Sequence, residues 1–210
     1  MGKLTSGILG NISGKVAGVV GGTWKDRNYL RSYVIPANPN TAAQQAQRSR
    51  LARAVEFAKA LVGPVFNGFV DPFQKSMSGF NYFIKTNIAC FTDPPLLEAI
   101  EITSGKLWLP AITAATLNPA ADTVTITHPT TLGNNGSATD QIYGAVYHAD
   151  THLWDFSAAP VARSEGSVEV PVSGTPNASD LHSWLFAAKV VGTAVVLLSA
   201  SRYHAVANEE

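Results

Sequence analysis

Hydrophobic and polar positions change their period along the chain and divide it into three parts. Residues 1–37 place short apolar pieces between glycines, a pattern typical of an extended arm or β-hairpin. Residues 38–95 repeat apolar side chains every three or four positions, which predicts a helical hairpin. Residues 96–210 alternate apolar and polar positions, as half-buried strands do. We therefore predict an α+β fold with domains at 1–37, 38–95 and 96–210.

The predicted arm holds seven glycines within its first 22 residues, followed by strand-forming residues from Trp24 to Ile35. Gly21 and Gly22 are expected to form its turn, because glycine accepts the positive φ angles of tight hairpins. A two-stranded ribbon is marginally stable in water, since it buries little apolar surface. The arm is therefore expected to lie on the rest of the chain or on a neighbouring subunit.

A helix is predicted directly after Pro36 and Pro39, which close the arm. Thr41 and Gln44 fit a capping box, in which the hydroxyl and the amide satisfy free backbone groups of the first turn. The helix is expected to end near Gly63. Its predicted apolar stripe comprises Leu51, Val55, Ala58 and Val62.

The second predicted helix begins with Asp71 and Pro72 and ends before Asp93. An aspartate accepts hydrogen bonds from a first helical turn, and a proline there loses no hydrogen bond. The stripe expected to pack against the first helix comprises Phe73, Met77, Phe80, Ile84 and Ile88.

The C-terminal part contains two clear strands, 123–127 and 167–172, in which every second residue is apolar. Pro171 places the second of them at a sheet edge, because proline cannot donate to a ladder. Short strands in this number are typical of an Ig/fibronectin-like antiparallel β-sandwich, and a small barrel is the weaker alternative. Further strands are expected at 97–102, 141–147, 152–156, 183–190 and 195–203.

Charge is distributed unequally although 15 basic and 15 acidic residues balance over the whole chain. Residues 1–90 hold 11 Lys and Arg against 3 Asp and Glu, and residues 91–210 hold 4 against 12. Opposite charges on two parts of one molecule attract one copy to the next, or let the basic part bind a polyanion. Both interpretations favour assembly over catalysis.

Motifs for catalysis, cofactors or metals are absent from the sequence. The glycines of the arm do not form a phosphate-binding loop. His148, Asp150 and His152 are the one metal-like group, but on a continuous strand they would span ~13 Å, too far for one ion. We therefore expect no enzyme activity, no cofactor and no metal. No apolar run is long enough to span a membrane, so no membrane partner is expected.

Short motifs in a fixed order carry a family resemblance. They are Trp24-Lys25, Arg31-Ser32, the run Asn38-Pro39-Asn40-Thr41-Ala42-Ala43-Gln44-Gln45-Ala46-Gln47-Arg48, and Ser78-Gly79-Phe80-Asn81-Tyr82-Phe83-Ile84. This block resembles an uncharacterised bacterial and prophage family of phage-type virion structural proteins, with a Gly-rich arm and a C-terminal Ig-like domain. The resemblance covers residues 1–90 by motif and the remainder in architecture.

The resemblance implies a non-enzymatic phage virion structural protein of the capsid, tail or connector, made in the host cytoplasm. Its implied partners are copies of itself, in a homo-oligomer, and other virion proteins. Nucleic acid is the weaker expected partner, because the basic part has no dense Lys/Arg run. The alternative function is an Ig-like binding module that recognises a carbohydrate or host surface through loops 133–138 and 174–180, although these loops hold no aromatic residue.

The expected subunit interface joins one aromatic anchor to polar residues of the arm and the first helix. Trp24 alternatively covers the core of its own domain. The arginines alternatively face nucleic acid or form a solvated helix face, and the glutamine alternatively binds water. The interface residues are Trp24, Arg27, Arg31, Asn38, Gln44, Arg48, Arg50 and Arg53.

Overall fold

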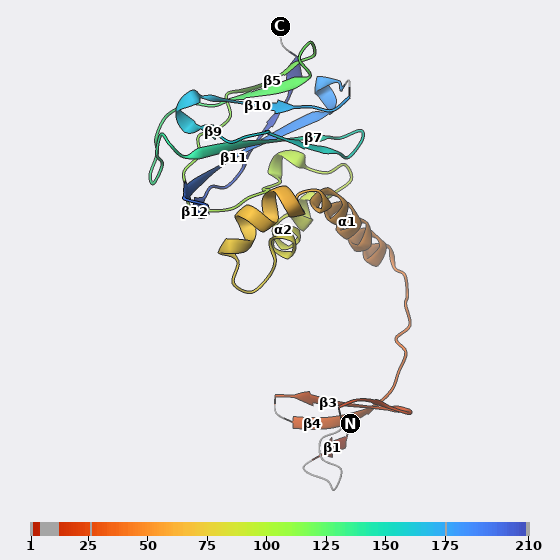
Figure 1. Cartoon of the computed structure of the whole chain (residues 1–210). Coiled ribbons are helices and arrows are strands. Elements are labelled where there is room, and N and C mark those ends of the chain that lie inside the picture. The colour runs from red at the N-terminus through yellow and green to blue at the C-terminus, as the bar shows by residue number, and fades with distance from the viewer. Residues whose placement is uncertain (1, 5–12, 26, 175, 209–210) are drawn as a thin grey trace. The chain divides into compact units, whose positions relative to one another are not determined.

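The computed structural model describes residues 2–4, 13–25, 27–174 and 176–208, and of residues 2–4 it describes the backbone alone (Figure 1). The chain forms two compact units, Met1–Ala42 and Ala43–Glu210, which we call the arm unit and the sandwich unit. The fold class is α+β with a C-terminal β-rich region, as predicted. The sequence placed a further boundary at residue 95, but the helical segments and the strands share one core and lie in one unit.

The arm unit is a four-stranded antiparallel sheet in the order β1-β4-β3-β2. The predicted turn at Gly21-Gly22 is wrong, because both glycines lie inside a strand. The chain turns instead at Ala17-Gly18, where Ala17 has the positive φ of 51° that a two-residue loop requires. The glycines at 5–12 lie outside the described residues. The strands are β1 (Gly2–Leu4), β2 (Gly14–Val16), β3 (Val19–Trp24) and β4 (Arg27–Ser32).

Helices form one layer of the sandwich unit. The first begins at Ala42, directly after Thr41, as the capping box predicts. Its predicted stripe is confirmed at Ala58 but wrong at Leu51, which is 44 % exposed, and the other buried residues of this segment are Ala54, Phe57 and Leu61. The large ring of Phe57 determines which face of the helix is buried, because it packs among five other aromatic rings. The helical segments are α1 (Ala42–Lys59), the π-helix η1 (Val62–Val70), the 3₁₀ turns η2 (Asp71–Phe73), η3 (Ile88–Cys90) and η4 (Leu97–Ala99), and α2 (Gly79–Asn87).

The second helix begins later than predicted, at Gly79. Its N-cap is Ser78, whose side chain accepts a hydrogen bond from Asn81 N at 3.3 Å. Asp71 does not begin the helix, because the 3₁₀ turn η2 ends at Phe73. Its carboxylate reaches across the loop and accepts a hydrogen bond from Gly79 N. The Asp71 side chain therefore caps the first turn of α2 although Asp71 lies outside that helix.

Two β-sheets form the other layers of the sandwich unit. One has the order β10-β6-β5-β14, and the other has the order β12-β11-β7-β8, with β13 beside β11 and β9 beside β7. The strands are β5 (Ala114–Asn118), β6 (Thr123–Thr127), β7 (Gln141–His148), β8 (Trp154–Phe156), β9 (Val161–Ala162), β10 (Ser167–Pro171), β11 (Leu181–Val191), β12 (Ala194–Leu198), β13 (Arg202–Ala205) and β14 (Ala207–Asn208). Two further 3₁₀ turns are η5 (Arg163–Glu165) and η6 (Ala178–Asp180).

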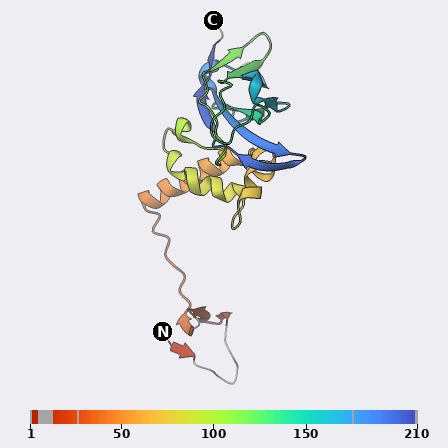
Figure 2. The same ribbon diagram turned by 90° about the vertical axis from the view of Figure 1, so that its left-hand side faces the viewer.

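The sheet of β7 and β11 lies between the second sheet and the helices (Figures 1 and 2). One of its faces, with Tyr147 and Trp184, packs on the helical layer. Its other face, with Ile142 and Leu185, packs on the sheet of β5, β6 and β10. Both faces of this sheet are therefore buried, and the unit has two apolar cores.

Most predicted strands are confirmed, including 123–127 as β6 and 167–172 as the edge strand β10. The strand predicted at 97–102 is wrong, because 97–99 form a 3₁₀ turn. The strand predicted at 195–203 is two strands, β12 and β13. The prediction missed strands β5 and β9, and it also missed the parallel pairing of β14 with β5 in a sandwich predicted to be antiparallel.

Candidate functional site

The arm sheet has two faces of different chemistry. Side chains alternate along a strand, and residues paired across strands share a face. Val16 pairs with Val19, whereas Lys15 and Arg31 both pair with Val20. We call one side the apolar face after Val16, Val19 and Leu30, and it also holds the uncharged polar side chains of Thr23, Asn28 and Ser32. We call the other the basic–aromatic face, which comprises Lys15, Val20, Trp24, Arg27, Tyr29 and Arg31.

Among the residues of the arm unit that the structure describes, none forms a core beneath the apolar face. Val16 is 59 % exposed and Val19 is 40 % exposed. Among residues 13–25 and 27–42, Gly21 alone is buried. The arm sheet therefore buries no side chain of these residues, although sheets of this size are normally stabilised by one packed face.

The basic–aromatic face alternates cations with aromatic rings. Arg27, Tyr29 and Arg31 occupy every second position of β4, and Tyr33 follows at the same spacing. The Lys15 Nζ lies 3.6 Å from the centre of the Tyr33 ring. In the same way, the Nζ of Lys25 lies 4.9 Å from the centre of the Trp24 ring. These contacts are cation–π interactions at an exposed surface.

The structure gathers three of the predicted interface residues, Trp24, Arg27 and Arg31, on this one face. Trp24 is 64 % exposed, so the alternative that it covers the core of its own domain is wrong for the arm unit. Asn38 lies exposed in the extended segment before α1. Sequence analysis missed Lys15, Lys25, Tyr29 and Tyr33, although the two-residue spacing from Arg27 to Tyr33 was a readable signal.

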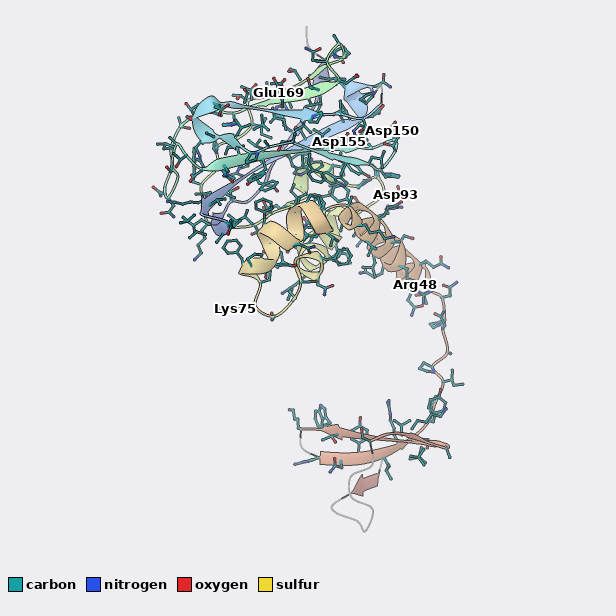
Figure 3. The ribbon with its side chains drawn as sticks, in the orientation of Figure 1. Arg48, Lys75, Asp93, Asp150, Asp155 and Glu169 are labelled. Atoms are coloured by element: carbon teal, nitrogen blue, oxygen red, sulfur yellow. The ribbon has the colours of Figure 1, made fainter. Side chains whose placement is uncertain are left out.

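The other four predicted residues lie on α1 in the sandwich unit. Gln44, Arg48 and Arg50 occupy its exposed first half, where Figure 3 labels Arg48. Arg53 lies further along, with its Nη2 3.0 Å from Asp93 Oδ2, and it also donates to Thr92 O. The expected interface is therefore divided between the two units.

Arg53 lines a groove between α1 and the segment 91–97. The deeper part has a volume of about 370 Å³, and its lining includes Glu56, Phe57, Phe91, Tyr147 and His152. An adjoining part of about 260 Å³ is lined by Ala46, Arg50 and Arg53 among others.

The polar groups at the groove wall are already engaged with each other. Tyr147 Oη lies 2.7 Å from His152 Nδ1. Burial, with a smaller contribution from Glu56, raises the pKa of Tyr147 to about 12, so its hydroxyl is neutral at physiological pH. A neutral phenol is a weak nucleophile and base, so Tyr147 supplies no activated group to the groove.

The metal-like group noted in the sequence, at which no metal was expected, is divided by a turn at 149–151. His148 Nε2 lies 2.8 Å from Asp155 Oδ2, whereas His152 contacts Tyr147. Among the described residues, no group of three His, Cys, Asp or Glu side chains is placed to hold a metal ion. Nor is any described helix both long and apolar enough for a transmembrane span.

A buried ion pair supports the loop 133–138, which the binding-module alternative requires. Arg163 is fully buried, with its Nη2 3.3 Å from Asp140 Oδ2, and it donates to Trp108 O at 2.7 Å. The Trp108 ring in turn packs so closely on Gly133 that a Cβ there would lie 2.2 Å from it. The structure therefore brings one aromatic residue to this loop from a distant segment, which sequence reasoning missed.

Comparison with known proteins gives one match. No curated protein and no solved structure matches this chain. The model of a family of unknown function (DUF6266) matches residues 11–199, which include most of the arm unit and the sandwich unit as far as β12. The chain therefore belongs to the family of unknown function DUF6266.

Proposed function

We propose that this chain is a non-enzymatic structural protein that assembles with copies of itself through the apolar face of its arm sheet, as a component of a phage-type virion. The observation that carries the proposal is the arm sheet without a core: it displays Val16 and Val19 to solvent and buries no side chain among residues 13–25 and 27–42. Such a sheet needs a partner surface to be stable.

A second copy of the same face is the partner that fits. Two sheets pack face to face at about 10 Å when both faces are apolar. The described residues of the apolar face carry no charge, so the pairing of two copies would remove no charged group from water. A face that pairs with itself closes a two-fold dimer, the commonest symmetry of homo-oligomers.

Net charge favours the encounter of copies. Residues 1–42 hold five basic residues and one acidic residue, and residues 43–210 hold 10 basic and 14 acidic residues. Opposite charges attract the arm unit of one copy to the sandwich unit of another over about a Debye length, ~8 Å at physiological ionic strength, and so bring copies together. Two arm units carry the same sign, so their apolar contact has to outweigh a repulsion that added salt screens. The first encounter of copies is therefore expected to slow as salt is added, while the arm–arm contact itself is expected to persist.

The virion assignment rests on the motif block from Trp24 to Arg48 and its resemblance to phage-type structural proteins. In this proposal the protein is made in the host cytoplasm and incorporated into particles with other virion proteins. Capsid, tail and connector are all lattices of repeated subunits, for which a self-pairing arm is suited.

The test is the mass of the full-length protein measured by light scattering at low and high salt. We expect assemblies that are multiples of the 22.2 kDa chain. The double variant Val16→Thr/Val19→Thr keeps β-branched side chains but buries two hydroxyls in the proposed interface, at a cost of about 1–3 kcal/mol each. It should shift the mass to the monomer.

A matched control is Val191→Thr/Val196→Thr, which changes two valines of the sandwich unit that are 63 % and 48 % exposed. The control should assemble as the unmodified chain does. A monomeric full-length protein at every salt concentration, or equal loss of assembly in both variants, would overturn the proposal.

A further inference from the structure

We propose that the basic–aromatic face of the arm sheet binds single-stranded nucleic acid. This activity goes beyond self-assembly and uses the opposite face of the same sheet. The face combines cations, which pair with phosphates, and exposed aromatic rings, on which unpaired bases stack.

The cations of the face are of one sign. Arg27, Arg31 and Lys15 lie on it, and Lys25 lies over the ring of Trp24 at its end. Residues 1–42 hold five basic residues against one acidic residue, Asp26, which lies outside the described residues. A surface with excess positive charge attracts a polyanion and is unsuited to an apolar interface.

The aromatic rings lie between these cations. Along β4 the order is Arg27, Tyr29, Arg31, and Tyr33 follows directly after the strand. At ~3.3 Å per residue the two arginines stand about 13 Å apart, with the Tyr29 ring between them. A strand of nucleic acid laid along β4 would therefore meet phosphate and base contacts in turn.

Two of the rings keep exposed surface beside their lysine contacts, since Trp24 is 64 % exposed and Tyr33 is 44 % exposed. Gly22 lets the Tyr29 ring lie against the sheet, because a Cβ at that position would lie 3.0 Å from Tyr29 Oη. Gly22, which the sequence placed in a turn, thus makes room for the Tyr29 ring on this face, whereas Gly21 pairs with Leu30 on the opposite one.

Nucleic acid fits this face better than an acidic protein surface does. The centres of protein interfaces are depleted in charged residues, whereas single-strand binding surfaces interleave cations with aromatic rings. Duplex DNA hides the faces of its bases, so it would use the cations and not the rings. The rings therefore predict a preference for single strands.

The experiment is a fluorescence anisotropy titration of the full-length protein with a labelled oligothymidylate of about 20 nucleotides, beside a duplex of equal length. Four phosphate contacts predict an affinity that falls about 50-fold between about 50 mM and 200 mM salt. Trp24→Ala should weaken binding to the single strand at least about five-fold through lost stacking. The duplex affinity should change little.

Arg27→Gln/Arg31→Gln should weaken binding to both probes at least about ten-fold and flatten the salt dependence. The matched control, Lys75→Gln/Lys106→Gln, removes two exposed lysines of the sandwich unit and the same net charge. Lys75 is labelled on the loop before α2 in Figure 3. The control should retain the affinity of the unmodified chain.

Three results would overturn the proposal: no binding at the lowest salt, equal loss in the control and the arginine variant, or unchanged single-strand affinity in Trp24→Ala with full competition by polyglutamate. The last result would assign the face to an acidic protein surface. Val16→Thr/Val19→Thr separates this proposal from self-assembly, because a monomeric variant that still binds the oligonucleotide shows that binding does not need assembly. An unmodified chain that is monomeric at every salt concentration but binds the oligonucleotide would leave this inference standing although the assembly proposal fails.

Discussion

The arm sheet and the central sheet of the sandwich unit have opposite burial. Strands β7 and β11 are buried on both faces, because helices cover one and a second sheet covers the other. Strands β3 and β4 have no buried residue except Gly21. The difference shows that the sandwich unit carries its own core, whereas the described residues of the arm unit bury no side chain on either face of their sheet.

One tryptophan from each unit illustrates this difference in burial. Trp184 is fully buried and donates its Nε1 hydrogen bond to Ile100 O at 2.9 Å, whereas Trp24 is 64 % exposed. A buried aromatic side chain stabilises its own domain, and an exposed one is available to a partner. Mutations should therefore separate stability from binding between the two units.

The largest effect is expected from Trp184→Ala. This change removes a ring that packs on Phe57, Trp154 and Tyr203 and leaves Ile100 O without its donor. The free energy of unfolding should fall by about 3–5 kcal/mol, measured by urea denaturation followed by far-UV circular dichroism. Trp24→Ala should change it by less than about 0.5 kcal/mol. Equal losses in the two variants would contradict the division into a packed unit and a displayed sheet.

A second large effect is expected at the buried ion pair. Arg163→Met leaves the Asp140 carboxylate buried without its counter-ion, which should cost about 3–5 kcal/mol of unfolding free energy. Adding Asp140→Asn should recover part of the loss, because no charge is then left unpaired. Arg31→Met removes an exposed arginine of the arm and serves as the matched control, with an expected change within about 0.5 kcal/mol. A larger loss in the double variant than in the single one would contradict the pairing.

The confirmed strands and the corrected ones differ in what covers them. Strand 123–127 was clear in the sequence because one face is buried and the other exposed, which gives strict alternation. Strands β7 and β11 gave weaker signals, since two covered faces make nearly every residue apolar. The segment 97–102 alternates without being a strand: the N–H groups of Glu101 and Ile102 bond to the side chains of Asn87 and Ser201. Such long-range partners have no local signal.

Some residues of the basic–aromatic face could be predicted from the sequence, and others could not. Trp24, Arg27 and Arg31 were expected to act together, and a tight turn places Trp24 opposite Arg27. Lys15 could not be assigned to this face from the sequence, because the face on which it lies depends on where the chain turns between β2 and β3. A turn at Gly21-Gly22 would leave Lys15 without the Val20 pairing that aligns it with Arg31. A shift of register changes which side chains share a face, and no composition argument detects it.

The smallest effect is a pH dependence confined to the sandwich unit, because all five histidines follow residue 96. Burial lowers the pKa of His128, helped by Arg163 and opposed by the carbonyl of Pro129. Burial also lowers the pKa of His182, opposed by Asp180. The unfolded chain then binds more protons than the native one below the ordinary histidine pKa of about 6.5.

Stability should therefore be complete above about pH 6.5 and decline as the pH falls toward the lowered native pKa values. Urea midpoints measured from about pH 7.5 down to about pH 5.5 test this, and His128→Gln/His182→Gln should flatten the profile in that window. Deleting residues 2–42 should leave the profile unchanged, since the arm contains no histidine. If the stability profile keeps its slope in the double variant, the acid sensitivity belongs to groups other than these two histidines. If the profile changes when the arm is deleted, the arm sheet contributes to the stability of the sandwich unit.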